Sequence, residues 1–165
     1  MKICGIDVQK YVLEQLASSH SVLTEDQKKL GVCLIDIGGG TSDVAIFSEG
    51  SISHTVNIPI AGEHVTNDIA RAIGTSIQNA EEIKKKHGCA WSDLADSDEL
   101  ITTQSINGRE NQSFSRQGLS SVIEVRYQEI FQIIKQHLGN TNLTQLLPAG
   151  IVLTGGASRI ELSLI

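Results

Sequence analysis

Residues 36–47, DIGGGTSDVAIF, have the composition of a loop that holds phosphate. Glycines lack the Cβ atom that would keep backbone N–H groups away from an anion. Asp36 could hold a hydrated Mg²⁺ that bridges phosphate oxygens, and Thr41 could add a hydroxyl donor. The alternative is a tight hairpin turn whose glycines only allow positive φ, and the motif alone leaves both interpretations open. The glycines are Gly38, Gly39 and Gly40.

A second glycine turn lies in residues 149–162, AGIVLTGGASRIEL. It follows an apolar strand-like run and precedes the expected start of a helix, which is a favourable place for a nucleotide. Gly155 and Gly156 would allow close approach of a ligand, and Arg159 could lay its guanidinium on an adenine face. In the alternative interpretation, Arg159 is a solvated helix residue.

Glu81 and Lys84 are three residues apart in AEEIKKKHG, so they share one face of an expected helix. Together they could reach ribose hydroxyls and adenine nitrogens. The alternative is a surface ion pair, which the spacing alone favours.

Several elements must position these groups. The runs at 30–37, 41–48 and 51–60 predict three strands of an antiparallel meander, with a tight turn at Glu49-Gly50. Residues 12–23 have helical spacing and precede the polar stretch 24–29. Residues 62–74 predict a helix that Gly74 ends, and 80–88 predict a short one with a capping-box-like start at Asn79 and a stop at His87-Gly88.

The remaining patterns predict a hairpin, a long helix and a last strand. Residues 99–115 contain Asn107-Gly108, which suits a type I′ turn. A long helix that ends at Gly139-Asn140 follows, and then the strand at 149–154. The apolar residues of the long helix recur at helical spacing and are Leu119, Val122, Ile123, Tyr127, Ile130, Ile134 and Leu138.

Composition excludes several classes of protein. The 165 residues suffice for one domain with a core, and the net charge of −6 argues against unaided nucleic-acid binding. No apolar run approaches the length of a membrane span, and the N-terminus lacks the features of a signal peptide. Cys4, Cys33 and Cys89 are expected to be free thiols in a reducing cytoplasm.

The motifs occur in the order found in actin-like ATPases: phosphate-2 loop, Glu-x-x-Lys helix, adenosine loop. Longer stretches, such as IPIAGEHVTNDIARAIG and RQGLSSVIEVRYQEIF, resemble the FtsA family of bacterial cell-division proteins. The resemblance implies an α/β, actin-like (ribonuclease H-like) ATPase fold, second half only, with a mixed sheet and an inserted α+β subdomain. It places the end of the first half at 1–29, subdomain 2A at 30–61 and 127–165, and subdomain 2B at 62–126.

The same resemblance implies ATP and Mg²⁺ as cofactors, with Asp36 on the metal side. The partners that it implies are other division proteins and, above all, the C-terminal tail of FtsZ, the tubulin-like division protein. For this tail the candidate residues are Arg116, Arg126 and Glu129. Arg126 and Glu129, three apart, could instead pair with each other. The implied nucleotide-binding residues are Asp36, Gly38, Gly39, Gly40, Thr41, Glu81, Lys84, Gly155, Gly156 and Arg159.

We therefore expect a septal scaffold fragment that in the full-length family self-associates and links the Z ring to the cytoplasmic face of the inner membrane. Residues 5–11, GIDVQKY, do not form a phosphate-1 turn, and the family's C-terminal amphipathic helix is expected to be absent here. With one wall of the cleft, we expect weak ATP binding and at most weak hydrolysis. The alternatives are a phosphotransferase or a chaperone-type ATPase of the same superfamily.

Overall fold

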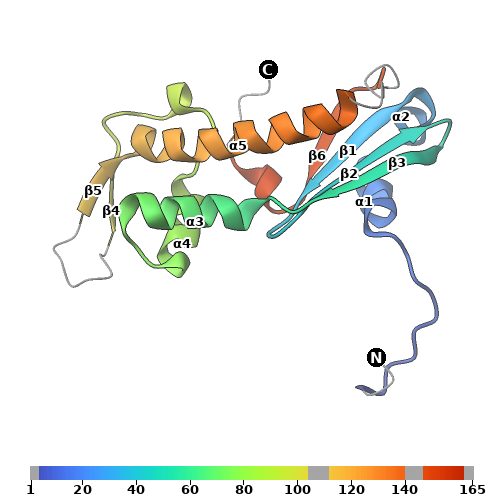
Figure 1. The fold of residues 1–165 in the computed structure, drawn as a ribbon, viewed down its shortest axis with the longest axis horizontal. Helices are drawn as coiled ribbons and strands as arrows, with labels where there is room; N and C mark the ends of the chain where they lie inside the picture. Colours follow the sequence, from blue (N-terminus) through green and yellow to red (C-terminus); the bar gives the residue numbers. More distant parts are fainter. Residues whose placement is uncertain (1–3, 104–111, 140–146, 162–165) are drawn as a thin grey trace.

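The computed structural model describes residues 4–103, 112–139 and 147–161 of the chain. Figure 1 shows a four-stranded sheet at one end and a group of helices with a two-stranded hairpin at the other. The long helix α5 (Arg116–Gly139) runs along both parts and joins them. The predicted α/β architecture with a mixed sheet is therefore confirmed.

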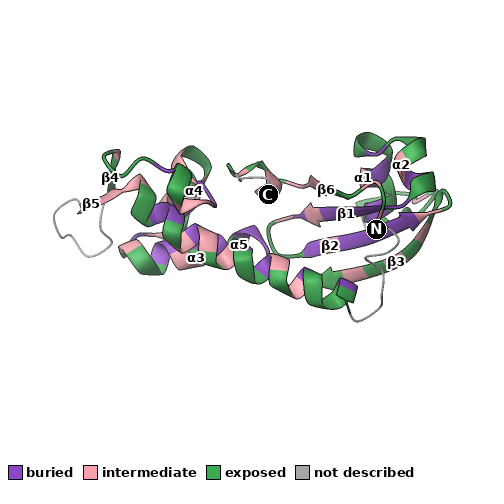
Figure 2. Ribbon diagram, turned by 90° about the horizontal axis from the view of Figure 1, so that it is seen from above, coloured by how far each residue is buried: buried purple, intermediate pink, exposed green. Residues whose placement is uncertain are grey.

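The sheet has the strand order β3-β2-β1-β6. Strands β1 (Val32–Ile37), β2 (Ser42–Ser48) and β3 (Ser51–Ile58) form the predicted antiparallel meander, and β6 (Ile151–Thr154) pairs parallel to β1. The central strands β1 and β2 are largely buried, whereas β3 is mostly exposed or half-buried (Figure 2). The glycine loop at residues 38–40 thus lies where the central pair of strands ends.

Two short helices, α1 (Glu14–Val22) and α2 (Glu25–Leu30), lie beside the sheet (Figure 1). The polar stretch 24–29 is therefore mostly helical. Thr24 caps α2 by accepting a hydrogen bond from the backbone of Gln27, whose side chain accepts one from the backbone of Thr24. A small core beneath them consists of Leu23, Val32, Leu34, Ala45 and Phe47.

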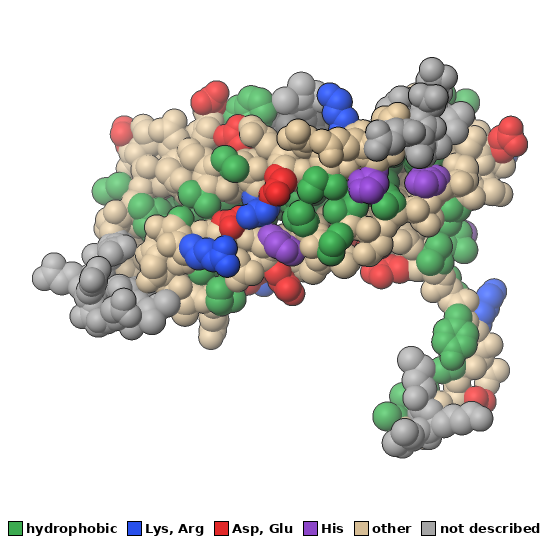
Figure 3. All heavy atoms as spheres, in the orientation of Figure 1, with side chains coloured by type: hydrophobic (Ala, Val, Ile, Leu, Met, Phe, Trp, Pro, Cys, Tyr) green, Lys and Arg blue, Asp and Glu red, His purple; other side chains and the backbone are tan. Residues whose placement is uncertain are grey.

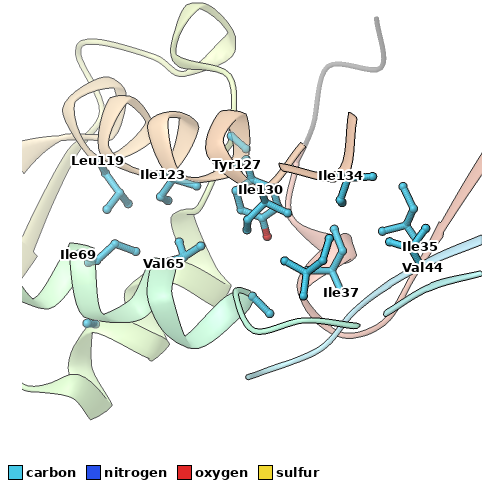
Figure 4. Packing of buried hydrophobic residues seen from close by; sticks show 14 of the residues in the cluster. Ile35, Ile37, Val44, Val65, Ile69, Leu119, Ile123, Tyr127, Ile130 and Ile134 are labelled. Carbon is cyan, nitrogen blue, oxygen red and sulfur yellow. The ribbon is translucent and has the colours of Figure 1, made fainter. Parts of the chain in front are cut away.

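The main core is built on α5, as the apolar spacing predicted. Figure 4 shows its side chains facing those of β1 and β2 at one end and those of α3 (Gly62–Ile73) at the other. The buried residues of α5 include Leu119, Ile123, Tyr127, Ile130, Ile134 and Leu138. One helix therefore fixes the sheet relative to the helical part.

Helix α4 (Ile77–His87) packs against α3 and ends at His87, as predicted. Its start was predicted wrongly: Ser76 is the N-cap and accepts a hydrogen bond from the backbone N–H of Asn79 at 3.1 Å. Ser76 precedes the first helical turn and its hydroxyl satisfies a free N–H there, so it takes the role assigned to Asn79.

Strands β4 (Leu100–Thr103) and β5 (Gln112–Ser115) form the predicted antiparallel hairpin, whose expected Asn107-Gly108 turn lies outside the described residues. A 3₁₀ turn, η2 (Ser92–Leu94), precedes it. After β6, a 3₁₀ turn at Ala157–Arg159, η4, replaces the expected helix start within the described range.

The N-terminal arm, residues 4–13, stands away from the body in Figures 1 and 3 and exposes Ile6, Tyr11 and Val12. Tyr11 is 84% exposed, so the arm adds little to the core. Across the described ranges, no helix combines the length and the apolar character that a membrane span requires. The three cysteines are free thiols, as expected.

Replacing Ile123 by alanine is expected to lower the free energy of unfolding by about 2–5 kcal/mol, because the side chain is fully buried in the core shared by α5 and α3. Chemical denaturation followed by circular dichroism measures the loss. The control is Val125→Ala on the same helix, where the side chain is 66% exposed and the expected change is within about 0.5 kcal/mol. Equal losses in the two variants would contradict this core.

Candidate functional site

The first glycine loop is held by the start of α3. The N–H of Gly38 donates to the carbonyl of Thr41 at 2.9 Å and closes the turn between β1 and β2. The N–H groups of Gly62 and Glu63 donate to the carbonyls of Gly38 and Gly39 at 3.1 and 2.8 Å. The loop is therefore rigidly attached to α3.

Gly38, Gly39 and Gly40 do not adopt positive φ, so the turn conformation does not demand glycine there. A Cβ on Gly40 would meet no atom within 4 Å, and one on Gly39 would meet the Glu63 carboxylate at 3.2 Å. In the described part of the chain, no hydrogen bond uses the backbone N–H groups of Gly39 and Gly40. This geometry favours close approach of a ligand as the reason for Gly39 and Gly40, whereas a Cβ on Gly38 would lie 3.3 Å from the Thr41 carbonyl oxygen of the turn itself.

The second glycine turn packs directly on the end of β1. Gly155 has a φ of +91°, and a Cβ there would lie 2.4 Å from both the Oδ1 of Asp36 and the carbonyl oxygen of Ile37. Because β6 runs parallel to β1 with Thr154 opposite Asp36, both glycine turns emerge from the same edge of the sheet. Gly155 is thus required both for its conformation and for its lack of a side chain.

Lys84 anchors α4 to the first turn of α3. Its side chain is 12% exposed, and its Nζ donates to the carbonyl of Gly62 at 3.0 Å and to the hydroxyl of Thr66 at 2.8 Å. The same ammonium lies 2.6 Å from Oε2 of Glu81, and Thr66 also hydrogen-bonds that carboxylate. The pair that spacing alone assigned to the surface is in fact part of a mostly buried network.

Two opposing effects set the pKa of Glu81. Burial raises it, but the hydrogen bonds from Lys84 and Thr66 and the charge of Lys84 together lower it by more, so the net pKa lies below the ordinary value. Burial also raises the pKa of the Tyr127 hydroxyl, as does the negative charge of Glu81. That hydroxyl donates to the carbonyl of Ala157 at 2.6 Å and ties α5 to the second glycine turn.

Two neighbouring hollows, of about 500 and 460 Å³, share Lys84, Lys85, Gly156 and Ala157 in their linings. The larger is also lined by Gly38, Gly39 and Glu81, and the smaller by Arg159. All three motifs that the sequence singled out therefore meet at one place.

Asp36, Gly40, Thr41 and Gly155 do not line these hollows. The Thr41 hydroxyl donates to Asp43 at 3.0 Å, and Asp36 accepts a hydrogen bond from Ser18 of α1 at 2.9 Å. Within the described ranges, no three His, Cys, Asp or Glu side chains gather as metal ligands. A Mg²⁺ ion at Asp36 would therefore be held largely through water and phosphate oxygens, as this ion commonly is.

The candidate partner-binding residues are engaged within the chain. Arg126 forms two hydrogen bonds with Asp68 of α3, at 2.6 and 3.0 Å, and a third with Glu129. The pairing of Arg126 with Glu129, one of the two interpretations of their spacing, is thus present. Arg116 contacts Glu161 at 2.6 Å and the carbonyl of His87 at 3.2 Å, so it joins α4, α5 and the segment after η4.

Sequence reasoning missed Thr66 and Asp68 as parts of these clusters and treated Tyr127 only as a core residue. Asp68 and Arg126 are 58 residues apart, and no local spacing signals such a contact. The side chain of Thr66 faces α4 from one turn inside α3, where the sequence pattern indicates only a helix.

The family model described as cell division protein FtsA matches residues 33–161. The cell division protein FtsA of Pseudomonas aeruginosa is 54% identical over 158 residues, and that of Escherichia coli strain K12 is 46% identical over 165 residues. Each alignment covers 96% of this chain, but only 38% and 39% of the respective relative. The chain thus spans about two fifths of the length of these relatives.

Solved structures with a similar fold include MreB5 of Spiroplasma citri bound to ADP, with a TM-score of 0.81 and 25% identity over 97% of this chain and 52% of that chain. The MamK double helical filament has a TM-score of 0.58 and 18% identity, and covers 79% of this chain and 42% of that chain. The fold is actin-like, as the motifs indicated.

Replacing Gly155 by alanine is expected to destabilise the chain by several kcal/mol, because a Cβ would clash at 2.4 Å with backbone and force a strained positive φ. The control is Gly156→Ala, where a Cβ meets nothing within 4 Å and the change is expected to stay within about 1 kcal/mol. Thermal unfolding of both variants measures the difference. Similar melting temperatures would contradict the close packing of this turn on β1.

Glu81→Gln is expected to reduce stability at neutral pH and to have a smaller effect in acid. The folded pKa of Glu81 is lowered, so its carboxylate contributes stability above the ordinary value of 4.5, and this contribution is lost as pH falls through the folded pKa. Urea unfolding of the wild type and the variant at pH 7 and well below pH 4.5 measures the loss of stability at each pH. Glu82→Gln is the control at the neighbouring exposed position, and an equal pH dependence in both variants would contradict the network.

Proposed function

Because the chain belongs to the FtsA family of cell division proteins, we propose that it is part of a nucleotide-binding scaffold of the division septum. The convergence of three motifs on one place supports this proposal: a glycine loop, the Glu81–Lys84 pair and a second glycine turn with Arg159 line adjoining hollows. Their distribution suits an adenine nucleotide, with backbone N–H groups for phosphate, a carboxylate for sugar hydroxyls and a guanidinium for a base.

In this proposal the N–H groups of Gly39 and Gly40 donate hydrogen bonds to phosphate oxygens, and Asp36 would hold a hydrated Mg²⁺. The Mg²⁺ ion would offset the phosphate charge when it is bound. Thr41 would need to turn its hydroxyl away from Asp43 to reach a phosphate, whereas Gly155 keeps the second turn close to Asp36. Glu81, Lys84, Gly156 and Arg159 contact the nucleoside.

We propose that the chain by itself binds ATP weakly and is at most a weak ATPase. Hydrolysis needs a positioned water and phosphates clamped from both sides. Nucleotide binding would then serve mainly to set the conformation of the scaffold.

The partner that we propose is the C-terminal tail of FtsZ, bound by the insertion at residues 62–126 and the adjoining part of α5. Asp68 holds the guanidinium of Arg126 in place. Glu129, the other partner of Arg126, is 47% exposed, so its carboxylate can move aside for a ligand. A carboxylate of the tail could take the remaining donors of Arg126. Arg116 would support this surface through its contacts with α4.

Self-association and membrane attachment are proposed for the full-length protein. We propose that the full-length protein self-associates and lies on the cytoplasmic face of the inner membrane at the division site, through a C-terminal amphipathic helix. The MamK double helical filament, which is similar in fold, is itself an assembly and supports this part of the proposal. In this arrangement the scaffold links the Z ring to the membrane.

The test is fluorescence anisotropy of a labelled FtsZ C-terminal tail peptide titrated with the chain, with circular dichroism on the same sample. Arg126→Gln is expected to weaken binding by about 10- to 100-fold, since a charge-assisted hydrogen bond is lost. Lys135→Gln, an exposed charge on the same helix, is the control and is expected to leave binding unchanged. A folded chain that does not bind the peptide would refute this partner.

A further inference from the structure

We propose that Thr66 is a positioning residue that fixes the Glu81 carboxylate to receive a ribose hydroxyl, so that the site prefers ribonucleotides to deoxyribonucleotides. This inference rests on the proposed nucleotide binding and names a residue and a specificity that the motifs do not contain.

Thr66 is 3% exposed and lies on α3, one turn after the glycine-loop contact at Gly62. Its hydroxyl accepts a hydrogen bond from Nζ of Lys84 at 2.8 Å and lies within hydrogen-bond distance of both the Gly62 carbonyl and Oε2 of Glu81. A hydroxyl has a single proton to donate. The charged carboxylate is the stronger acceptor, so we assign the proton to Glu81.

This arrangement makes the two oxygens of Glu81 different. Oε2 receives both Thr66 and the ammonium of Lys84, at 2.6 Å. Oε1 contacts Nζ of Lys85 at 3.3 Å, and that lysine side chain is 73% exposed. An exposed ion pair of this kind is weak and its ammonium is easily hydrated instead. Oε1 is therefore the oxygen available to a ligand.

The position of the carboxylate suits a sugar rather than a phosphate. Glu81 lines the larger hollow together with Gly39 of the first glycine loop and Gly156 of the second turn, so it shares this hollow with residues expected at both ends of a nucleotide. A negative carboxylate repels phosphate and accepts hydrogen bonds from hydroxyl groups. A ligand with a hydroxyl at this point gains a charge-assisted hydrogen bond, and a deoxy analogue leaves Oε1 without one.

Without the Thr66 hydroxyl, only Lys84 and the weak, exposed ion pair with Lys85 would hold the carboxylate. Lys84 carries a point charge that pairs equally well with either oxygen, so it fixes distance better than orientation. Removal of the hydroxyl therefore frees the carboxylate to rotate while the ion pair with Lys84 persists. The expected consequence is a loss of sugar discrimination that exceeds the loss of overall affinity.

The experiment compares the affinities of the chain for ADP, 2′-deoxy-ADP and 3′-deoxy-ADP by isothermal titration calorimetry in the presence of Mg²⁺. The variants are Thr66→Val, which keeps the shape and removes the hydroxyl, and Thr66→Ser, which restores the hydroxyl. Thr66→Ala replaces the valine variant if circular dichroism shows that the latter does not fold. Thr55→Val, at an exposed position of β3, is the matched control.

The wild-type chain is expected to bind ADP at least 5-fold more tightly than one of the two deoxy analogues. Thr66→Val is expected to bring this ratio to within 2-fold of unity, while Thr66→Ser and Thr55→Val retain it. An unchanged ratio in Thr66→Val, or equal affinities of the wild type for all three nucleotides, would overturn the inference. Failure of the folded wild type to bind any of them would instead refute the proposed nucleotide site on which it depends.

Discussion

The side chain of Lys84 is 12% exposed, and the site is arranged around the oxygens that pair with its ammonium. A buried cation is costly unless it is paired and hydrogen-bonded, and Lys84 has Glu81, Thr66 and the Gly62 carbonyl as partners. Gly62 is also the residue whose N–H holds the first glycine loop. The contacts that Lys84 needs therefore hold α4 close to α3, and α3 in turn holds the first glycine loop.

A second set of contacts extends this arrangement to α5. Tyr127 binds the carbonyl of Ala157 in the second glycine turn, and the preceding residue, Arg126, binds Asp68 of α3. The proposed nucleotide hollows and the proposed partner surface are therefore connected through α5, by the adjacent residues Tyr127 and Arg126. Arg126 is a structural cross-link as well as a candidate recognition residue, which explains why it is only 24% exposed.

The parts of the fold that depend on local patterns could be predicted from the sequence, and those that depend on distant contacts could not. Short apolar runs bounded by glycines and a tight turn indicated the meander, helical spacing indicated α5, and glycine motifs indicated both loops of the site. Residues 24–29 were predicted only as a polar stretch, whereas Thr24 and Gln27 form a capping box at the start of α2. Thr66 and Asp68 have polar side chains on an ordinary amphipathic helix, and only the packing of α4 and α5 reveals their partners.

Helix α5 has a mechanical consequence. Its 24 residues span about 36 Å and include no proline, and its glycines, Gly118 and Gly139, lie near its two ends. A helix without such residues in its interior bends little, so α5 is a rigid connection between the sheet and the hairpin. A tilt of about 5° at the sheet would displace the far end by about 3 Å, given this length. A small change in the tilt of α5 at the glycine turns would thus displace the β4–β5 hairpin by several ångströms.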